Sequence, residues 1–257
     1  MISQEDGVSE IVGFVLVFAI VISGIALVTL EGYPMLMTSR MAADEAAMEQ
    51  SFFGLQDEIR MLTSSAVPYC DVPFGISDGT VEVIEQADGA IVTVSSGVPV
   101  SGLPLEFQPG AICSRPGEGE AVLLYENGAV IRGTSGENGS VMLSPPRWFF
   151  DTHSKTLVIP CIVIQPATTI LQRTGRGIST FSLESPYEYV DITFPEPGTT
   201  IILDYSPGRV CNSASAWGYY VTNDVPLTVF RTEDGRFIAD SVCRLVVKIY
   251  NVRVLQL

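Results

Sequence analysis

Basic residues are scarce in this chain of 257 residues. Lys155 and Lys248 are the two lysines, His153 is the one histidine, and 29 acidic residues against 14 Lys and Arg give a net charge of −15. A polyanion such as DNA or RNA needs a surface rich in cations. We therefore expect no nucleic-acid partner, and we interpret the acidic surface as a source of solubility.

The sequence also lacks the cysteine spacing that is typical of zinc sites. The five cysteines, none of them in a C-x-x-C pair, are Cys70, Cys113, Cys161, Cys211 and Cys243. With a single histidine to accompany them, they predict no zinc site. In a head outside the cytoplasm they could form up to two disulfides with one thiol left over. Cys161 lies inside the apolar segment LVIPCIVI and is the best candidate for a buried free thiol.

No catalytic motif is present. The chain has no G-x-S-x-G, P-loop, G-x-G-x-x-G or EF-hand sequence, and His153 lies in the polar segment 151–155, where a surface turn is favoured over a general base. Aromatic clusters at 148–150 and 217–220 could stack on sugars, but core packing is the favoured interpretation. We therefore expect no enzyme, no catalytic residue, no cofactor and no metal.

A long apolar run is present near the N-terminus. Residues 11–30, IVGFVLVFAIVISGIALVTL, contain no charge, no proline and no amide side chain. As a helix rising ~1.5 Å per residue, this run would cross the ~30 Å hydrocarbon core of a bilayer once. A cleaved secretory signal is disfavoured, because the leader MISQEDG has no Lys or Arg and the run is too long. The sequence predicts a single-pass anchor in contact with membrane lipid.

The sequence around the start of this run, GVSEIVGFVL at residues 7–16, resembles the N-terminus of archaeal type IV pilin-like proteins. The resemblance implies that a prepilin peptidase cuts between Gly7 and Val8, which leaves Glu10 as the third mature residue. It also implies other pilin-like subunits and the pilus assembly machinery as partners. An N-terminus in the cytoplasm and a head outside the cell membrane follow from the same resemblance, since too few Lys and Arg flank the run to apply the positive-inside rule.

Glu10 has two interpretations. It could be an interfacial carboxylate near a helix N-terminus, where the helix dipole favours a negative charge. The pilin resemblance instead implies a buried acid that neutralises the terminal amine of a neighbouring subunit during assembly. Both alternatives remain open at this point.

After the run, residues 31–34 (EGYP) predict a break or kink, because Pro34 cannot donate a helical hydrogen bond. Helical periodicity then resumes, with charged residues between the members of one apolar stripe: Met41, Met48, Phe52, Leu55, Ile59 and Leu62. This stripe could pack on the protein's own sheet, which is the favoured interpretation, or form a seam between subunits.

From residue 66 onward, short β-branched and aromatic runs alternate with turn residues. Three Asp-Gly or Asn-Gly pairs, at 88–89, 127–128 and 234–235, predict two-residue hairpin turns. The segment 213–221 could be a short helix, and paired prolines near 145–146 or 195–197 are possible subdivision points. The expected strands lie at 80–85, 90–95, 121–125, 129–132, 156–165, 178–183, 187–194, 199–205, 227–231 and 244–257.

The predicted fold is α+β: a long N-terminal helix, transmembrane and then amphipathic, packed on an antiparallel, sandwich-like β-rich head. We expect a leader and transmembrane helix at 1–34, an amphipathic helix at 35–65 and an extracytoplasmic head at 66–257. Asn138 begins an N-x-S sequon and is a candidate glycosylation site. The favoured function is a pilin-like structural subunit or minor pilin. The alternative is a monomeric surface protein that binds or adheres through its head and uses the helix only as an anchor.

Overall fold

The computed structural model describes residues 4–64, 69–77, 79–117, 121–134, 139–168, 171–184, 187–195, 198–209, 212–224, 230–233 and 236–257. Packing divides the chain into two units, Met1–Ala46 and Ala47–Leu257. The first unit is helical from residue 4 onward. The second unit, called the head from here on, contains all of the described strands.

The helical stretch does not end at the proline. Helix α1 spans Gln4–Leu27, a π-helical turn (η1) spans Val28–Gly32, and α2 spans Tyr33–Ser64. The Tyr33 N–H donates to the Val28 carbonyl, five residues back, so the predicted interruption takes the form of a π turn instead of a break. Such a turn accommodates one extra residue and lets a helix continue where α-helical bonding is disturbed, here just before Pro34.

Within the first unit, residues 11–30 are apolar on all sides of the helix. Every side chain from residue 11 to residue 30 is exposed, and the large apolar ones keep between 49% and 74% of their surface accessible. Within the described residues, the continuous helix that contains this run is the one helix long and apolar enough to cross a membrane. The chain therefore carries a helix suited to a single-pass anchor.

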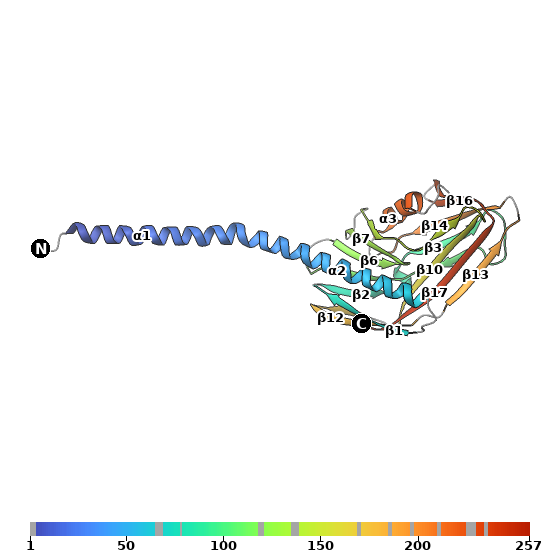
Figure 1. The fold of residues 1–257 in the computed structure, drawn as a ribbon, viewed down its shortest axis with the longest axis horizontal. Coiled ribbons are helices and arrows are strands. Elements are labelled where there is room, and N and C mark those ends of the chain that lie inside the picture. The colour runs from blue at the N-terminus through green and yellow to red at the C-terminus, as the bar shows by residue number, and fades with distance from the viewer. Residues whose placement is uncertain are drawn as a thin grey trace. The chain divides into compact units, whose positions relative to one another are not determined.

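The described part of the head contains three sheets, and Figure 1 shows their arrangement. The strands of each sheet are named here in the order in which they pair. Sheet A consists of β1 (Tyr69–Ile76), β12 (Gly177–Glu184), β17 (Arg244–Gln256), β10 (Thr156–Pro166) and β9 (Phe149–Asp151), with β13 (Tyr187–Thr193) also paired to β17. Sheet B consists of β11 (Gln172–Thr174), β2 (Thr80–Ile84), β5 (Ala111–Arg115), β6 (Ala121–Glu126), β7 (Ala129–Thr134) and β8 (Val141–Ser144). Sheet C consists of β15 (Phe230–Glu233), β16 (Arg236–Val242), β14 (Thr199–Ser206), β3 (Ile91–Ser96) and β4 (Leu105–Phe107).

One strand pair departs from the antiparallel prediction. Strands β10 and β17 run parallel, in register from Thr156 opposite Arg244 to Pro166 opposite Val254. Every other strand pair that the structure describes is antiparallel. A parallel pair needs a long crossover connection, and here the segment between the two strands includes β11 to β16.

The predicted turns had three outcomes. Asn127 and Gly128 have φ angles of 47° and 82° and join β6 to β7, as a type I′ turn requires. The prediction of a hairpin turn at 88–89 is wrong. Residues 86–88 form a 3-10 turn (η2), and the flanking strands β2 and β3 belong to different sheets. The pair 234–235 lies outside the described residues, although β15 and β16 on either side of it pair antiparallel. The predicted short helix is present as α3 (Ala214–Tyr219), followed by a π turn, η3 (Tyr220–Asp224).

Two hydrophobic cores lie on opposite faces of sheet B. On β6, Leu123 and Tyr125 contribute to the helix-side core, which also contains five buried members of the α2 stripe: Met48, Phe52, Leu55, Ile59 and Leu62. The alternate residues Val122 and Leu124 contribute to the second core, called the aromatic core here, which is built from sheets A, B and C with α3. Figure 1 shows α2 and α3 on opposite sides of β6 and β7. Met41, the sixth stripe residue, is exposed and lies in the first unit.

Candidate functional site

The pilin-type positions lie at the start of the chain. The backbone of Gly7, Val8 and Glu10 is part of helix α1. Asn138, the candidate glycosylation site, lies outside the described residues. The cleavage, assembly and glycosylation assignments therefore stay predictions.

His153 is an exposed turn residue, as expected from its polar surroundings. Its backbone N–H donates to Asp151 Oδ1 at 3.0 Å, and the Ser154 hydroxyl donates to Asp151 Oδ2 at 2.6 Å. These bonds lower the pKa of the Asp151 carboxyl, with the bond from Ser154 as the largest cause. Asp151 thus organises the turn between β9 and β10. In the part of the chain that the structure describes, no three His, Cys, Asp or Glu residues gather as metal ligands.

Cys161 is a fully buried free thiol, as predicted. It lies on β10 in the aromatic core, and burial raises the pKa of its thiol well above the ordinary value of 9.0. Cys70, on β1, is a half-buried free thiol. Cys211 lies outside the described residues.

Three members of the aromatic clusters fill the core, as the favoured interpretation predicts for them. Trp148, Trp217 and Tyr220 are buried, and the two indole rings lie 5.4 Å apart between centroids. Tyr220 packs edge-on against both rings, with centroids 6.0 Å away. Such contacts are typical of stabilising aromatic packing. Phe149 and Tyr219, neighbours of these residues in the sequence, are exposed instead.

A buried carboxylate lies beside these rings. Glu126, at the end of β6, is 2% exposed, and its Oε1 accepts hydrogen bonds from Tyr205 Oη at 2.7 Å, Trp217 Nε1 at 2.7 Å and Ser213 Oγ at 3.3 Å. Burial raises the pKa of Glu126 above its ordinary value of 4.5, while the three donors act in the opposite direction. Because its partners come from β14 and the start of α3, Glu126 ties three segments together.

The next residue, Asn127, faces a different environment. Its Oδ1 accepts the backbone N–H of Ile162 on β10 at 2.9 Å, which fixes the orientation of the amide. Its Nδ2 is buried and has no hydrogen-bond partner within the described structure, although Asn127 as a whole is 1% exposed. A buried donor without a partner costs about 1–3 kcal/mol, so this nitrogen is a candidate contact for a ligand.

Gln56 on α2 secures the same turn from the helix side. Its Nε2 donates to the Gly128 carbonyl at 2.7 Å, and its Oε1 accepts the Ser144 hydroxyl at 2.6 Å. Gln56 is 1% exposed, so these bonds form in a water-poor environment where they hold the turn in place. The β6–β7 turn is therefore fixed by α2 on one side and β10 on the other.

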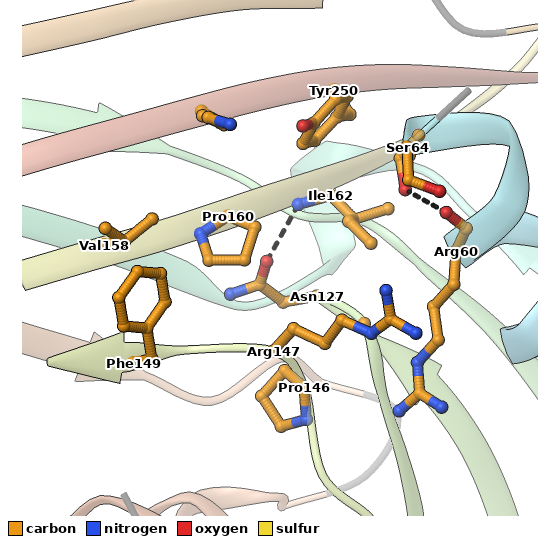
Figure 2. A pocket seen from close by; sticks show the side chains of 13 residues that line it. Arg60, Ser64, Asn127, Pro146, Arg147, Phe149, Val158, Pro160, Ile162 and Tyr250 are labelled. Atoms are coloured by element: carbon orange, nitrogen blue, oxygen red, sulfur yellow. Dashed lines mark hydrogen bonds between the residues drawn. The ribbon is translucent and has the colours of Figure 1, made fainter. Parts of the chain in front are cut away.

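A cavity of about 270 Å³ opens beside this turn and is called the Asn127 pocket here. Its wall consists of apolar and polar side chains from α2, the β6–β7 turn, the segment before β9, and strands β9, β10 and β17. Figure 2 shows Arg60 and Arg147 on one side of the pocket, Phe149 and Val158 on the other, and Asn127 between them. A volume near the lower end of ordinary ligand sites fits a small molecule or the end of a chain.

The charge of this pocket is opposite to that of the protein. Three cations, Arg60, Arg147 and Lys248, line it, and none of the described lining residues is acidic. Arg60 is paired with Asp57, at 3.0 Å between Nη1 and Oδ1, and donates through Nη2 to the Pro145 carbonyl at 2.8 Å. Its Nε is a second buried donor without a partner in the described structure. The pocket therefore combines positive charge with unused hydrogen-bond donors.

The sequence contained only partial signals of this site. The Asn-Gly pair at 127–128 predicts a turn, Arg60 is one of the charged residues between the members of the apolar stripe, and Lys248 lies in the strand expected at 244–257. Each assignment concerns local structure, and the residues come together only because β10 and β17 pair in parallel beside the β6–β7 turn. The concentration of cations in a chain with few of them becomes visible only in three dimensions.

A profile of a family of unknown function, DUF7289, matches residues 7–192, which is more than half of the chain. The chain belongs to the DUF7289 family. The match begins before the apolar run and ends in β13, so it includes Arg60, Asn127 and Arg147 of the pocket and leaves Lys248 outside. No curated protein matches this DUF7289 chain, and no solved structure does.

Proposed function

We propose that this DUF7289 protein is a membrane-anchored, pilin-like surface subunit. Its N-terminus lies in the cytoplasm, its apolar helix spans the membrane, and its sandwich-like β-rich head lies outside. Archaeal type IV pilin-like proteins are the group that the N-terminal segment 7–16 resembles. Assembly partners are other pilin-like subunits and the pilus machinery.

The observation that carries this proposal is the fully exposed apolar helix. Fourteen large apolar side chains between residues 11 and 30 have no cover within the described structure. A contiguous apolar surface of this size is unstable in water and needs lipid or other apolar helices around it. Both environments suit a pilin-like subunit, which passes from a membrane pool into a filament.

Filament formation is the decisive test. Material sheared from cells that express the protein should contain filaments that bind an antibody against the head. Glu10→Leu should abolish these filaments while leaving the protein in the membrane, because the proposed pairing with a neighbouring amine is lost. Glu5→Leu is the matched control, since Glu5 lies in the leader. Labelled filaments with the Glu10 variant would contradict the pairing assigned to Glu10, and no filaments with the wild-type protein would contradict the assembly role itself.

Processing gives a second readout. N-terminal sequencing of protein purified from membranes should find a chain that begins at Val8, and Gly7→Val should block the cut. A wild-type chain that begins at Met1 or Ile2 would mean that the segment is an uncleaved anchor.

A second candidate function is a monomeric surface protein whose head binds a ligand. The Asn127 pocket, with cations and unpaired donors around a defined cavity, is the observation that favours it. A membrane-retained protein that forms no filaments but binds a ligand in this pocket would support this alternative over the assembly role.

A further inference from the structure

The Asn127 pocket has the chemical features of a ligand site. In the head of a protein with a net charge of −15, one small cavity is lined by three cations and, among described residues, by no acid. Arg147 and Lys248 are exposed and form no ion pair with the residues that the structure describes. Their charges are therefore available to a bound anion.

The pocket also offers donors at its buried end. Asn127 Nδ2 lacks a hydrogen-bond partner in the described structure, and the bond from Ile162 N–H to Oδ1 prevents the amide from turning over. Figure 2 shows the amide nitrogen of Asn127 directed toward the Phe149 side of the pocket. An acceptor atom on a ligand would complete the hydrogen bonding of this amide.

Much of the remaining wall is apolar, although Thr63, Ser64 and Tyr250 also line the pocket. Val158, Pro160 and Ile162 are alternate residues on one face of β10, and Phe149 on β9 lies beside them. These side chains have no hydrogen-bonding groups to offer and favour a hydrocarbon or ring. A ligand that fits must therefore join an anionic acceptor to an apolar group.

We propose that the Asn127 pocket binds a carboxylate attached to an apolar or aromatic group. One carboxylate oxygen accepts from Asn127 Nδ2, the cations Arg147 and Lys248 balance the charge, and the apolar part lies between Phe149 and Pro160. A planar carboxylate matches the fork of an arginine. This site is independent of filament assembly, so the proposal does not depend on the pilin-like role.

Two sources can supply this chemistry: a free carboxylic acid and the C-terminus of a peptide. Fluorobenzoate represents the first, and a short peptide ending in phenylalanine represents the second. The same peptide with an amidated C-terminus distinguishes a carboxylate contact from side-chain binding. Fluorobenzamide and phenyl phosphate test the need for a charge and for a carboxylate.

The experiment is a titration of the full-length protein in uncharged detergent, followed by fluorine NMR for the fluorinated probes and by calorimetry for the others. Fluorobenzoate should show saturable binding, and fluorobenzamide should show none. Arg147→Gln and Lys248→Gln should each raise the Kd of fluorobenzoate about tenfold, the loss expected for one charge-assisted contact. Arg173→Gln, which removes an exposed cation on β11 outside the pocket, should leave the Kd unchanged.

Asn127→Asp tests the buried donor. Aspartate tolerates the positive φ of the turn and keeps an oxygen for Ile162 N–H, but it replaces the donor Nδ2 with an acceptor. Binding of fluorobenzoate should be lost while the melting curve stays cooperative. Tighter binding of phenyl phosphate, equal effects of Arg173→Gln and Arg147→Gln, or no saturable binding of either carboxylate probe would each overturn the proposal.

Discussion

The two halves of the N-terminal helical stretch use apolar side chains in opposite ways. Between residues 11 and 30 every side chain is exposed, whereas Phe52, Leu55 and Ile59 on α2 are fully buried in the head. The first half is apolar on all sides and needs an apolar surrounding. The second half has charged residues between the members of its stripe and needs a partner on one side only. The same secondary structure thus forms a surface suited to a membrane in one half and part of a core in the other, and the pattern of charge decides which.

The largest expected effect concerns the buried half. Phe52→Asp combined with Ile59→Asp places two charges in the helix-side core, and large-to-small changes alone cost about 2–5 kcal/mol at each site. Since domains are stable by about 5–15 kcal/mol, the head should lose its cooperative unfolding transition. Intrinsic fluorescence is a suitable measurement, because both tryptophans lie in the aromatic core.

The control for this double variant is Glu49→Ala. Glu49 pairs with Arg132 at 3.0 Å on a partly exposed face, so its loss should cost less than about 1 kcal/mol. If the double aspartate variant melts like the wild type, the stripe does not hold its own head together. A seam between subunits would then explain the stripe better.

The next effect concerns the exposed half. Ile20→Lys should weaken membrane insertion, since a lysine near the centre of a spanning helix costs about 2.5–3.5 kcal/mol. The fraction of full-length protein that stays with membranes after a carbonate wash at high pH measures this. Ile20→Leu should behave like the wild type. Wild-type protein in the wash supernatant would contradict the anchor and would leave the exposed run without a membrane role.

An effect of similar size is expected at the polar contact between α2 and the sheet. Gln56→Leu leaves the Gly128 carbonyl and the Ser144 hydroxyl without their buried partner, which should cost about 2–4 kcal/mol of unfolding free energy. Urea unfolding followed by tryptophan fluorescence gives this value. Gln50→Leu, on the exposed side of the same helix, should change it little. An equal loss in both variants would show that Gln56 has no special role.

The smallest expected effect concerns Glu126, which lies beside the rings of the aromatic core. Since burial raises the folded-state pKa of Glu126 above 4.5, stability is greatest below that value and is lost as pH rises toward the folded-state pKa. Glu126→Gln keeps an acceptor and cannot ionise. Its melting temperature relative to the wild type should therefore increase between pH 4 and pH 8. A difference that stays constant over this range would mean that the folded-state pKa of Glu126 is not raised.

Strands with strong local signals could be predicted. β10 is a long, largely apolar run, and β17 is a long run of β-branched and other apolar residues with polar residues between them. The Asn-Gly pair between β6 and β7 requires positive φ angles that few other residue pairs adopt. β1 was missed because Pro73 interrupts its pattern, and the proline is tolerated because β1 is an edge strand of sheet A. Short strands such as β4, β9 and β11 contain three residues each, too few for periodicity to be visible.

The sequence by itself determined the elements whose cause is local. An uncharged run specifies a helix that is apolar on all sides, a stripe at helical spacing specifies a helix that is apolar on one side, and Asn127-Gly128 specifies a turn, because each depends on residues that are neighbours along the chain. Only the tertiary structure decided that β10 and β17 pair in parallel and that Ile162 N–H occupies one side of the Asn127 amide. The Asn127 pocket depends on these two long-range contacts, since they bring its cations and unpaired donors together. The hydrogen bonding of the buried Glu126 side chain depends in the same way on donors from distant segments, Tyr205 and Trp217, which no local pattern reveals.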